Sequence, residues 1–401
     1  MTPEELQALF DPDVQELIEK HIGDDPAAFA MKFHDRNGLP VRAIAEQIAC
    51  RHKAAKKLPN LSLRNLLYTT LSLEQASGER TAHYKSGLEE MAGKKLLDMT
   101  GGLGVDSAFF ANRFEEVIYV ERDEVLAEIA SHNFRELGIN NITVIRGDST
   151  ELLEVSSDNT FDWVFLDPAR REKGKRSVSL EDAEPNVVKL HNLVLCKARK
   201  LCVKASPALE ISALREKLPS LSQVLVLSVD RECKEVLLFC EREKAGEPVV
   251  VKAVCLGRGG ETFFLSDKEA GRRKRIAGVG AYFYEPDPAI IKARLTAVLA
   301  DHYELQFINP TIDYLTSGRK IERFPGRSFR VMAALPYKPR VLKSFLKEHG
   351  ITAASIQRRD FPLSPDKIRH IYSLKESDEH YLFFLKDSRR RLLCLYCGHL
   401  Y

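Results

Sequence analysis

Between residues 94 and 243, short β-rich runs alternate with amphipathic segments long enough to form helices, and this alternation limits the fold more than any other feature. Strands that alternate with helices build a parallel sheet with helices on its faces. The last two runs are separated only by residues 230–235, too short for a helical crossover, so they must be antiparallel neighbours. The pattern predicts an α/β, Rossmann-like sheet with an antiparallel last strand. The expected strands are 95–99, 117–121, 142–146, 163–166, 200–204, 224–229 and 236–240.

The segments on either side of this sheet have different patterns. Residues 4–90 place apolar side chains at helical spacing and are broken at Asp24-Asp25-Pro26 and Gly38-Leu39-Pro40. After residue 246, strand-like runs and helices follow in the order of small ferredoxin-like α+β units, the second of which begins at Arg327. We therefore expect four domains: a helical domain at 1–90, the sheet domain at 91–246, a small ferredoxin-like domain at 247–326 and a basic domain at 327–401.

Charge is distributed unevenly along the chain. The formal net charge is only +3, but it divides into about −7 for residues 1–244 and about +10 for residues 245–401. A basic module joined to an acidic one is typical of polyanion binders, because clustered Lys and Arg release phosphate counterions. A solvated surface is the alternative interpretation.

Hydropathy and cysteine usage indicate a cytoplasmic protein. No apolar run reaches the length of about 18 residues that a membrane span needs, and the start of the chain lacks the pattern of a secretory signal. Most of the eight cysteines lie inside apolar runs, which fits a reducing compartment. Cys394 and Cys397, followed by His399, have metal-ligand spacing, but a structural zinc site needs four ligands. We expect an ordinary terminal strand there and no metal.

Acidic and glycine residues stand where three successive strands end. The first strand runs into the turn 98–106, whose glycines let the backbone approach a ligand at the carboxyl edge of the sheet. Glu121 ends the second strand, where a carboxylate can accept hydrogen bonds from ribose hydroxyls, and Asp148 follows the third, beside an expected adenine. NAD and S-adenosylmethionine share an adenosine half, so this series by itself leaves both cofactors open.

The fourth strand and the antiparallel finish favour S-adenosylmethionine. Asp167 and Pro168 directly follow the strand 163–166, so a carboxylate and a main-chain carbonyl point into the crevice and can accept from a substrate amino group. Such acceptors position an amine for methyl transfer without a strong base. The first turn also lacks the Gly-x-Gly-x-x-Gly pattern of a dinucleotide site.

The chain resembles bacterial class I S-adenosylmethionine-dependent methyltransferases, in particular an uncharacterised group with a THUMP-like carboxyl-terminal domain. The resemblance covers most of the chain from about residue 70. It implies S-adenosylmethionine as the cofactor, and it implies an RNA substrate because THUMP domains usually accompany RNA-modifying enzymes. The matching motifs are Leu73-Glu-Gln75-Ala-Ser77, Thr81-Ala-His-Tyr84-Lys85, the turn 98–106, Phe165-Leu-Asp167-Pro-Ala-Arg-Arg171, Tyr284-Glu-Pro-Asp287, Tyr314-Leu-Thr and Phe324-Pro-Gly-Arg327.

These observations give three groups of candidate site residues. The sequence departs from the Asp/Asn-Pro-Pro-aromatic motif of amino-group methyltransferases at Ala169 and Arg170, which leaves N6-adenine methylation in doubt. Arg170 can stack on a base or hold a phosphate. Expected catalytic residues are Asp167, Pro168 and Arg170; expected cofactor-binding residues are Gln75, Asp98, Thr100, Gly101, Gly104, Asp106, Glu121 and Asp148; expected substrate-binding residues are Arg171 and Lys204.

We expect a methyltransferase acting on a base in RNA, which is held through residues 245–401. The alternatives are a protein or small-molecule methyltransferase, an RNA-binding adaptor with a vestigial catalytic fold, and an NAD-dependent dehydrogenase. Cys202 lies near the same crevice, but its apolar neighbours indicate a core thiol rather than a nucleophile.

Overall fold

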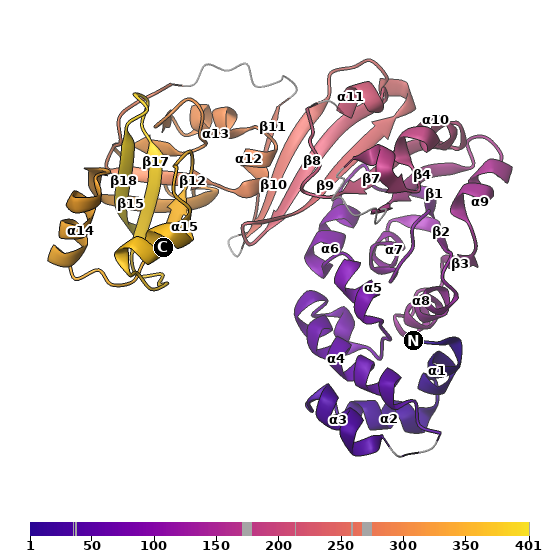
Figure 1. Ribbon diagram of the computed structural model, residues 1–401. Coiled ribbons are helices and arrows are strands. Elements are labelled where there is room, and N and C mark those ends of the chain that lie inside the picture. The colour runs from indigo at the N-terminus through magenta and orange to yellow at the C-terminus, as the bar shows by residue number, and fades with distance from the viewer. Residues whose placement is uncertain are drawn as a thin grey trace. The chain divides into compact units, whose positions relative to one another are not determined.

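The computed structural model describes residues 1–34, 36, 38–170, 179–212, 214–257, 260–266 and 275–400 (Figure 1). The chain divides into two compact units. Unit 1 contains Met1–Gln223 and Val236–Glu247, and unit 2 contains Val224–Glu235 and Pro248–Tyr401.

Unit 1 begins with short helices, as the sequence predicts, drawn in indigo and purple in Figure 1. Thr2, Asp11 and Asp25 cap the first three helices, each of which has proline in its first turn, where the missing amide is not needed. Gln47 is fully buried and exchanges two hydrogen bonds with the main chain of Tyr68, at 2.7 and 3.0 Å. The helices are α1 (Pro3–Leu9), α2 (Pro12–Lys20), α3 (Pro26–Phe33), α4 (Val41–Lys57), the 3-10 turn η1 (Leu61–Leu63), α5 (Thr70–Gln75) and α6 (Glu79–Gly87).

The central sheet has the strand order β11-β10-β8-β9-β7-β4-β1-β2-β3. Strands β1, β2, β3, β4 and β7 pair in parallel, whereas β9 is antiparallel to β7. The predicted antiparallel finish is therefore confirmed. The first nine strands are β1 (Gly93–Asp98), β2 (Phe114–Glu121), β3 (Ile142–Arg146), β4 (Phe161–Leu166), β5 (Ala169–Arg170), β6 (Ala183–Glu184), β7 (Ala198–Ala205), β8 (Leu221–Val229) and β9 (Glu232–Glu241).

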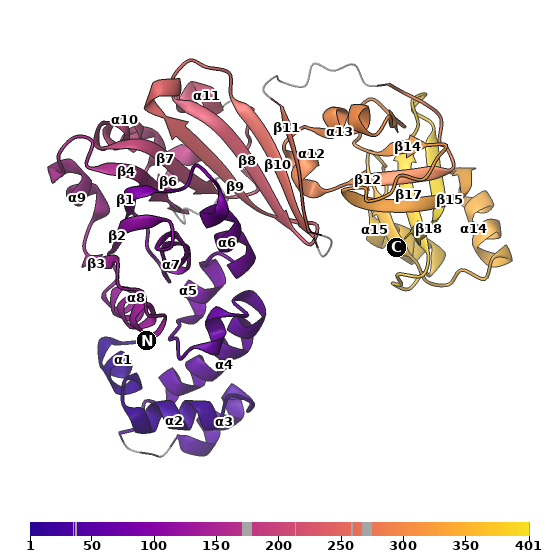
Figure 2. The same cartoon turned by 180° about the vertical axis from the view of Figure 1, so that it is seen from behind.

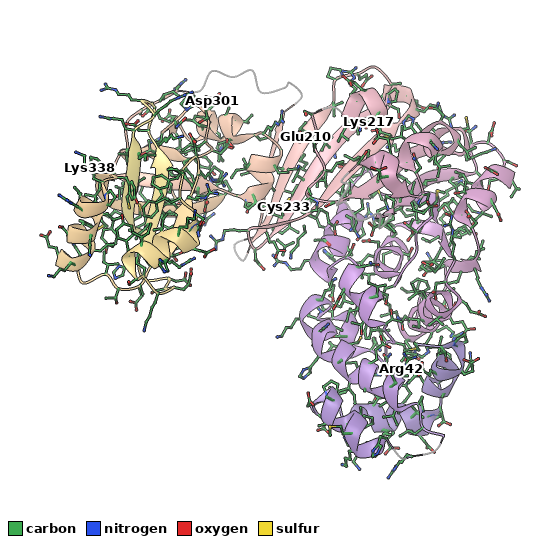
Figure 3. The ribbon with its side chains drawn as sticks, viewed as in Figure 1. Arg42, Glu210, Lys217, Cys233, Asp301 and Lys338 are labelled. Atoms are coloured by element: carbon green, nitrogen blue, oxygen red, sulfur yellow. The ribbon has the colours of Figure 1, made fainter. Side chains whose placement is uncertain are left out.

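Helices cover this sheet and connect its parallel strands, which can be followed from both sides in Figures 1 and 2. α7 and α8 pack against β2, and α10 packs against β7. The side chain of Asn133 on α8 exchanges two hydrogen bonds with the main chain of Leu67, at 2.8 and 2.9 Å, and so ties the amino-terminal segment to the sheet domain. The connecting elements are α7 (Val105–Phe110), α8 (Glu124–Glu136), α9 (Ser149–Val155), η2 (Leu180–Asp182), α10 (Val187–Lys197), α11 (Leu214–Lys217) and η3 (Arg242–Lys244). Figure 3 labels Lys217 on α11, which forms an ion pair with Glu181 of η2 at 2.7 Å.

Unit 2 contains a seven-stranded sheet with the order β13-β14-β12-β15-β18-β17-β16. Successive residues of β17 face opposite sides: Phe383 joins an aromatic cluster with Phe283 and Phe329, whereas Phe384 joins the cluster under α14 and α15. Both faces are therefore covered, which explains the continuous apolar run of β17. The elements are β10 (Val250–Gly257), β11 (Gly260–Ser266), β12 (Tyr282–Pro286), α12 (Pro288–Lys292), α13 (Thr296–His302), β13 (Gln306–Phe307), β14 (Leu315–Ser317), β15 (Gly326–Pro336), α14 (Pro339–Glu348), β16 (Ser355–Arg358), α15 (Pro365–Tyr372), β17 (Tyr381–Lys386) and β18 (Leu392–Leu400).

The sequence pattern did not predict how two sets of strands are assigned to sheets. Strands β10 and β11 continue the order of the central sheet instead of belonging to the seven-stranded one. Strand β12, from the segment 247–326, pairs with β15 from the segment 327–401, so these two segments share one sheet. Among the helices of the described ranges, none is both long and apolar enough to cross a bilayer.

Candidate functional site

The glycine turn after β1 is built so tightly that glycine is required. The amide of Gly101 donates to the carbonyl of Val120 at 3.0 Å, which ties the turn to β2. A Cβ on Gly101 would lie 2.1 Å from the ring of Tyr119, and Gly104 has φ of +79° with the Phe134 ring 2.6 Å from its would-be Cβ. The turn thus brings main chain, without side chains, to the carboxyl end of β1 and β2.

Asp98, the last residue of β1, is buried at the base of this turn. Its carboxylate accepts from the amide of Thr100 at 3.1 Å and from the hydroxyl of Ser107 at 2.6 Å. Burial raises the pKa of Asp98 to about 7, against the effect of these two hydrogen bonds. The hydroxyl of Thr100 in turn accepts from the amide of Asp167 at 2.6 Å, which joins the turn to the end of β4.

Glu121 and Asp148 end the next two strands, as predicted, and each also has a local partner. Glu121 accepts from the amides of Gly102 and Asp123, both at 2.9 Å, so its carboxylate fixes the glycine turn from the β2 side. Asp148 caps α9 and forms an ion pair with Arg122 at 2.6 Å. Hydrogen bonds and Arg122 hold the pKa of Asp148 below its usual value, although desolvation opposes them.

Asp167 and Pro168 lie where β4 ends, and both are partly exposed. The side chain of Asp167 is 34% exposed and forms an ion pair with the ammonium of Lys204 at the end of β7. The main chain of Arg170 lies on β5 and pairs with Ala183 of β6. Arg171 lies outside the described residues.

Beneath Asp167, four side chains form a buried polar network. The ammonium of Lys85, on α6, lies 2.9 Å from Asp106 Oδ1 and donates to the hydroxyl of Ser77 at 2.9 Å. Ser77 donates to Asp106 Oδ2 at 2.7 Å and receives a hydrogen bond from Lys204 at 3.0 Å. Lys204 also lies 3.8 Å from Asp106 Oδ2. Asp106 therefore faces this network.

Together with Asp167, the network is electrically balanced. Lys85, Lys204, Asp106 and Asp167 contribute two ammonium and two carboxylate groups within ion-pair distance of one another. Burial alone would raise the pKa of Asp106, but the ammonium groups of Lys85 and Lys204 hold it below its usual value. The side chain of Lys85 is only 1% exposed, so these partners replace the water that its ammonium group loses on burial.

The position of α6 is fixed by a buried carboxylate at its start. Glu79 is 6% exposed and accepts from the amides of Asn60 and Leu61, at 2.9 and 3.2 Å. This clamp places Ser77 and Lys85 against the glycine turn. Gln75 ends α5 and is exposed.

Sequence reasoning located the strand ends but missed two members of the network. Ser77 and Lys85 appeared only inside two matching motifs, without individual roles, because a serine and a lysine before the first strand form no recognisable pattern. Lys204 was expected to bind substrate, and in the structure its ammonium group pairs with Asp167 and Asp106. The residues that the structure brings together are Ser77, Lys85, Asp98, Thr100, Asp106, Asp167 and Lys204.

The three cysteines named in the sequence analysis for their chemistry are buried. Cys202 is buried on β7. Cys394 and Cys397 lie on β18, a strand as expected, and burial raises the pKa of both thiols. Within the described part of the chain, no group of three or more His, Cys, Asp or Glu side chains is arranged to hold a metal ion.

The chain was compared with known families, proteins and structures. Residues 79–218 match the family model described as Conserved hypothetical protein 95, and residues 326–398 match the model described as THUMP domain-like. Two strains of Mycobacterium tuberculosis, CDC 1551 / Oshkosh and ATCC 25618 / H37Rv, each have a relative described as an uncharacterized S-adenosylmethionine-dependent methyltransferase. Each is 26% identical over 340 residues, covering 83% of this chain and 89% of the relative. A crystal structure of a Porphyromonas gingivalis W83 protein, assigned as a methyltransferase, is 26% identical, covers 100% of both chains and has a TM-score of 0.84.

Proposed function

Because the chain is a class I S-adenosylmethionine-dependent methyltransferase with a THUMP-like carboxyl-terminal domain, we propose that it methylates a base in RNA. The observation that carries the proposal is the partly exposed Asp167 at the end of β4, joined to the glycine turn through Thr100 and neutralised by Lys204.

The residues around the turn fit the cofactor. Gly101 and Gly104 let the turn pack directly on the rings of Tyr119 and Phe134, so its main chain would be available to a cofactor at the carboxyl end of β1. Burial raises the pKa of Asp98 and so disfavours its ionised form. The cationic amino group of the methionine moiety would stabilise that ionised form. Glu121 and Asp148 would hold the ribose and adenine, and Gln75 would contact the methionine end. The bound cofactor supplies a methyl group on a sulfonium.

The acceptor would be oriented by Asp167 and the main chain of Pro168. Both offer oxygen atoms that accept from an amino group, which frees and aims the nitrogen lone pair toward the methyl group. Arg170 and Arg171 would hold the rest of the substrate, by stacking on a base or by binding phosphate.

The balanced network favours a neutral acceptor over a protein lysine. A lysine substrate enters as an ammonium and needs an unpaired carboxylate nearby, whereas Lys204 already pairs with Asp167. A nucleobase amino group is neutral and needs only hydrogen-bond acceptors. The pairing of Lys204 with Asp167 therefore favours a base in RNA over a protein lysine as the acceptor.

RNA binding is supported by the carboxyl-terminal part. The THUMP-like match lies within residues 245–401, which carry a formal charge of about +10. We also propose a cytoplasmic location, because all eight cysteines are free in the structure.

A methyl-transfer assay tests the proposal. The full-length protein is incubated with radiolabelled S-adenosylmethionine and total RNA from cells that lack the gene. We expect label in RNA with the wild type and at least a hundredfold less with Asp167→Asn, while both bind S-adenosylhomocysteine equally in calorimetry. Label in added protein from the same cells, and none in RNA, would overturn the proposal.

A further inference from the structure

Helix α14 (Pro339–Glu348) carries a basic face that faces away from the core of unit 2. Leu342 and Leu346 are buried on one side of the helix. Arg340, Lys343 and Lys347 follow one another at spacings of three and four residues, which places them together on another face, and all three are exposed. Figures 1 and 2 show α14 at the rim of this unit beside β15 and β18, and Figure 3 labels Lys338 at its start.

These cations are not used for folding. Within the described ranges, the side chains of Lys338, Arg340, Lys343 and Lys347 form no ion pair or hydrogen bond. Other cations of the unit do: Arg319, Lys320 and Lys386 pair with Glu304, Glu322 and Asp360, at 2.6, 3.0 and 2.8 Å. The positive charge of unit 2 is therefore locally unbalanced on α14.

The start of α14 is unfavourable for stability. It has no side-chain cap and no acidic residue in its first turn, and Lys338 and Arg340 lie at the positive end of the helix dipole. A cation there costs about 0.3–1 kcal/mol. By contrast, α15 of the same unit has Ser364 as its cap and Asp366 in its first turn. The preference for a capping side chain and an acidic first turn is therefore followed at α15 but not at α14. Such a local departure indicates a functional role for the start of α14.

We propose that this basic face of α14, formed by Arg340, Lys343 and Lys347, binds the phosphate backbone of the RNA substrate. The inference rests on the proposed function. From Arg340 to Lys347 the helix rises about 10 Å, which matches the rise of about three nucleotides in one strand. The contacts are to phosphates, so the face fixes the RNA in place and does not read its sequence.

The test compares two triple variants of the full-length protein that lose the same charge. One is Arg340→Gln, Lys343→Gln and Lys347→Gln. The matched control is Arg319→Gln, Lys320→Gln and Lys386→Gln, which removes cations that are already paired. Binding to a fluorescent 20-nucleotide poly(U) is measured between 50 and 200 mM KCl, and S-adenosylhomocysteine calorimetry and thermal unfolding check that each variant is folded.

The salt dependence gives the decisive number. Each lost phosphate contact reduces the slope of log affinity against log salt by about 0.7 for a single strand. We expect the α14 variant to lose about 2 from the slope and the control less than about 0.7. Equal losses in both variants, no loss in either, or binding to anionic lipid vesicles without binding to poly(U) would overturn the assignment.

The two proposals fail separately. If the wild type labels RNA in the methyl-transfer assay while the α14 variant binds and labels RNA as well as the control, the proposed function stands and the surface is wrong. If the wild type labels no RNA, the function itself is wrong.

Discussion

At the scale of single residues, the site rests on carboxylates whose surroundings assign them different tasks. Asp98 is buried under the turn, Glu121 fixes the turn from the side, and Asp167 is partly exposed next to Lys204. Each can be tested separately because the structure gives it different partners.

Asp98 makes the stability of the protein depend on pH. An unfolded aspartate titrates near ~3.9, whereas the pKa of Asp98 is raised to about 7 in the folded protein. The folded state therefore holds a proton that the unfolded chain releases, so this stabilisation is present below about pH 4 and is lost as the pH rises through about 7. The Asp98→Asn variant has no carboxyl group at this position, so its stability lacks this dependence on pH. Between pH 5 and pH 8, the wild type should lose on the order of 1–3 kcal/mol of unfolding free energy relative to Asp98→Asn, measured by urea unfolding. If the difference in unfolding free energy between the wild type and Asp98→Asn stayed constant over this pH range, the raised pKa of Asp98 would be contradicted.

Glu121 should matter for the cofactor and not for the fold of the strand. Glu121→Ala removes the acceptor for two turn amides and the expected partner of the ribose hydroxyls, so we expect at least tenfold weaker binding of S-adenosylhomocysteine by calorimetry. Glu115→Ala, at an exposed position on the same strand, is the control and should bind normally. Equal binding by both variants would show that Glu121 is not at the cofactor site.

The residues that sequence could predict are those that stand at strand ends. Asp98, Glu121, Asp148 and Asp167 follow from the strand pattern alone, since parallel strands finish at one edge of a sheet. Lys85 could not be found this way, because its role depends on how α6 packs against the glycine turn. The side-chain partner of Lys204 was also beyond a pattern that shows only where a strand ends.

At the scale of elements, the link between α6 and α7 is the least expected feature. Lys85 belongs to α6 and Asp106 to α7, and their ion pair at 2.9 Å is almost completely buried. Removing one partner leaves the other charged and poorly solvated, which typically costs about 3–5 kcal/mol, although Lys204 would offset part of this cost here.

A double-mutant cycle measures that link. We expect Lys85→Met and Asp106→Leu each to lower the free energy of unfolding, and the double variant to lose at least about 1 kcal/mol less than the sum of the two. The measurement is urea unfolding at pH 7. Additive effects within about 0.5 kcal/mol would mean that the two side chains do not stabilise one another.

The elements also show where sequence pattern stops being informative. The seven strands and the antiparallel pair β8 and β9 were predicted because periodicity and a short connection determine them. The sequence did not predict that β10 and β11 belong to the central sheet, because two apolar strands fit either sheet equally well. The pairing of β12 with β15 joins segments that the sequence pattern treated as separate domains. Such long-range pairing leaves no local signal. The four-domain division remains a prediction.

At the scale of the whole molecule, the chain combines a methyltransferase unit with a basic THUMP-like part. The charge balance around Asp167 favours the proposed neutral acceptor, and the unpaired cations of α14 favour the proposed polyanion. RNA meets both requirements, since it offers neutral base nitrogens and a phosphate backbone.

The most direct test is mass spectrometry of the methylated nucleosides in total RNA from cells with the gene, without it, and with the gene restored as wild type or as Asp167→Asn. We predict that one methylated nucleoside is lost on deletion, returns with the wild type and does not return with Asp167→Asn. An identical set of methylated nucleosides in all four strains would contradict RNA methylation.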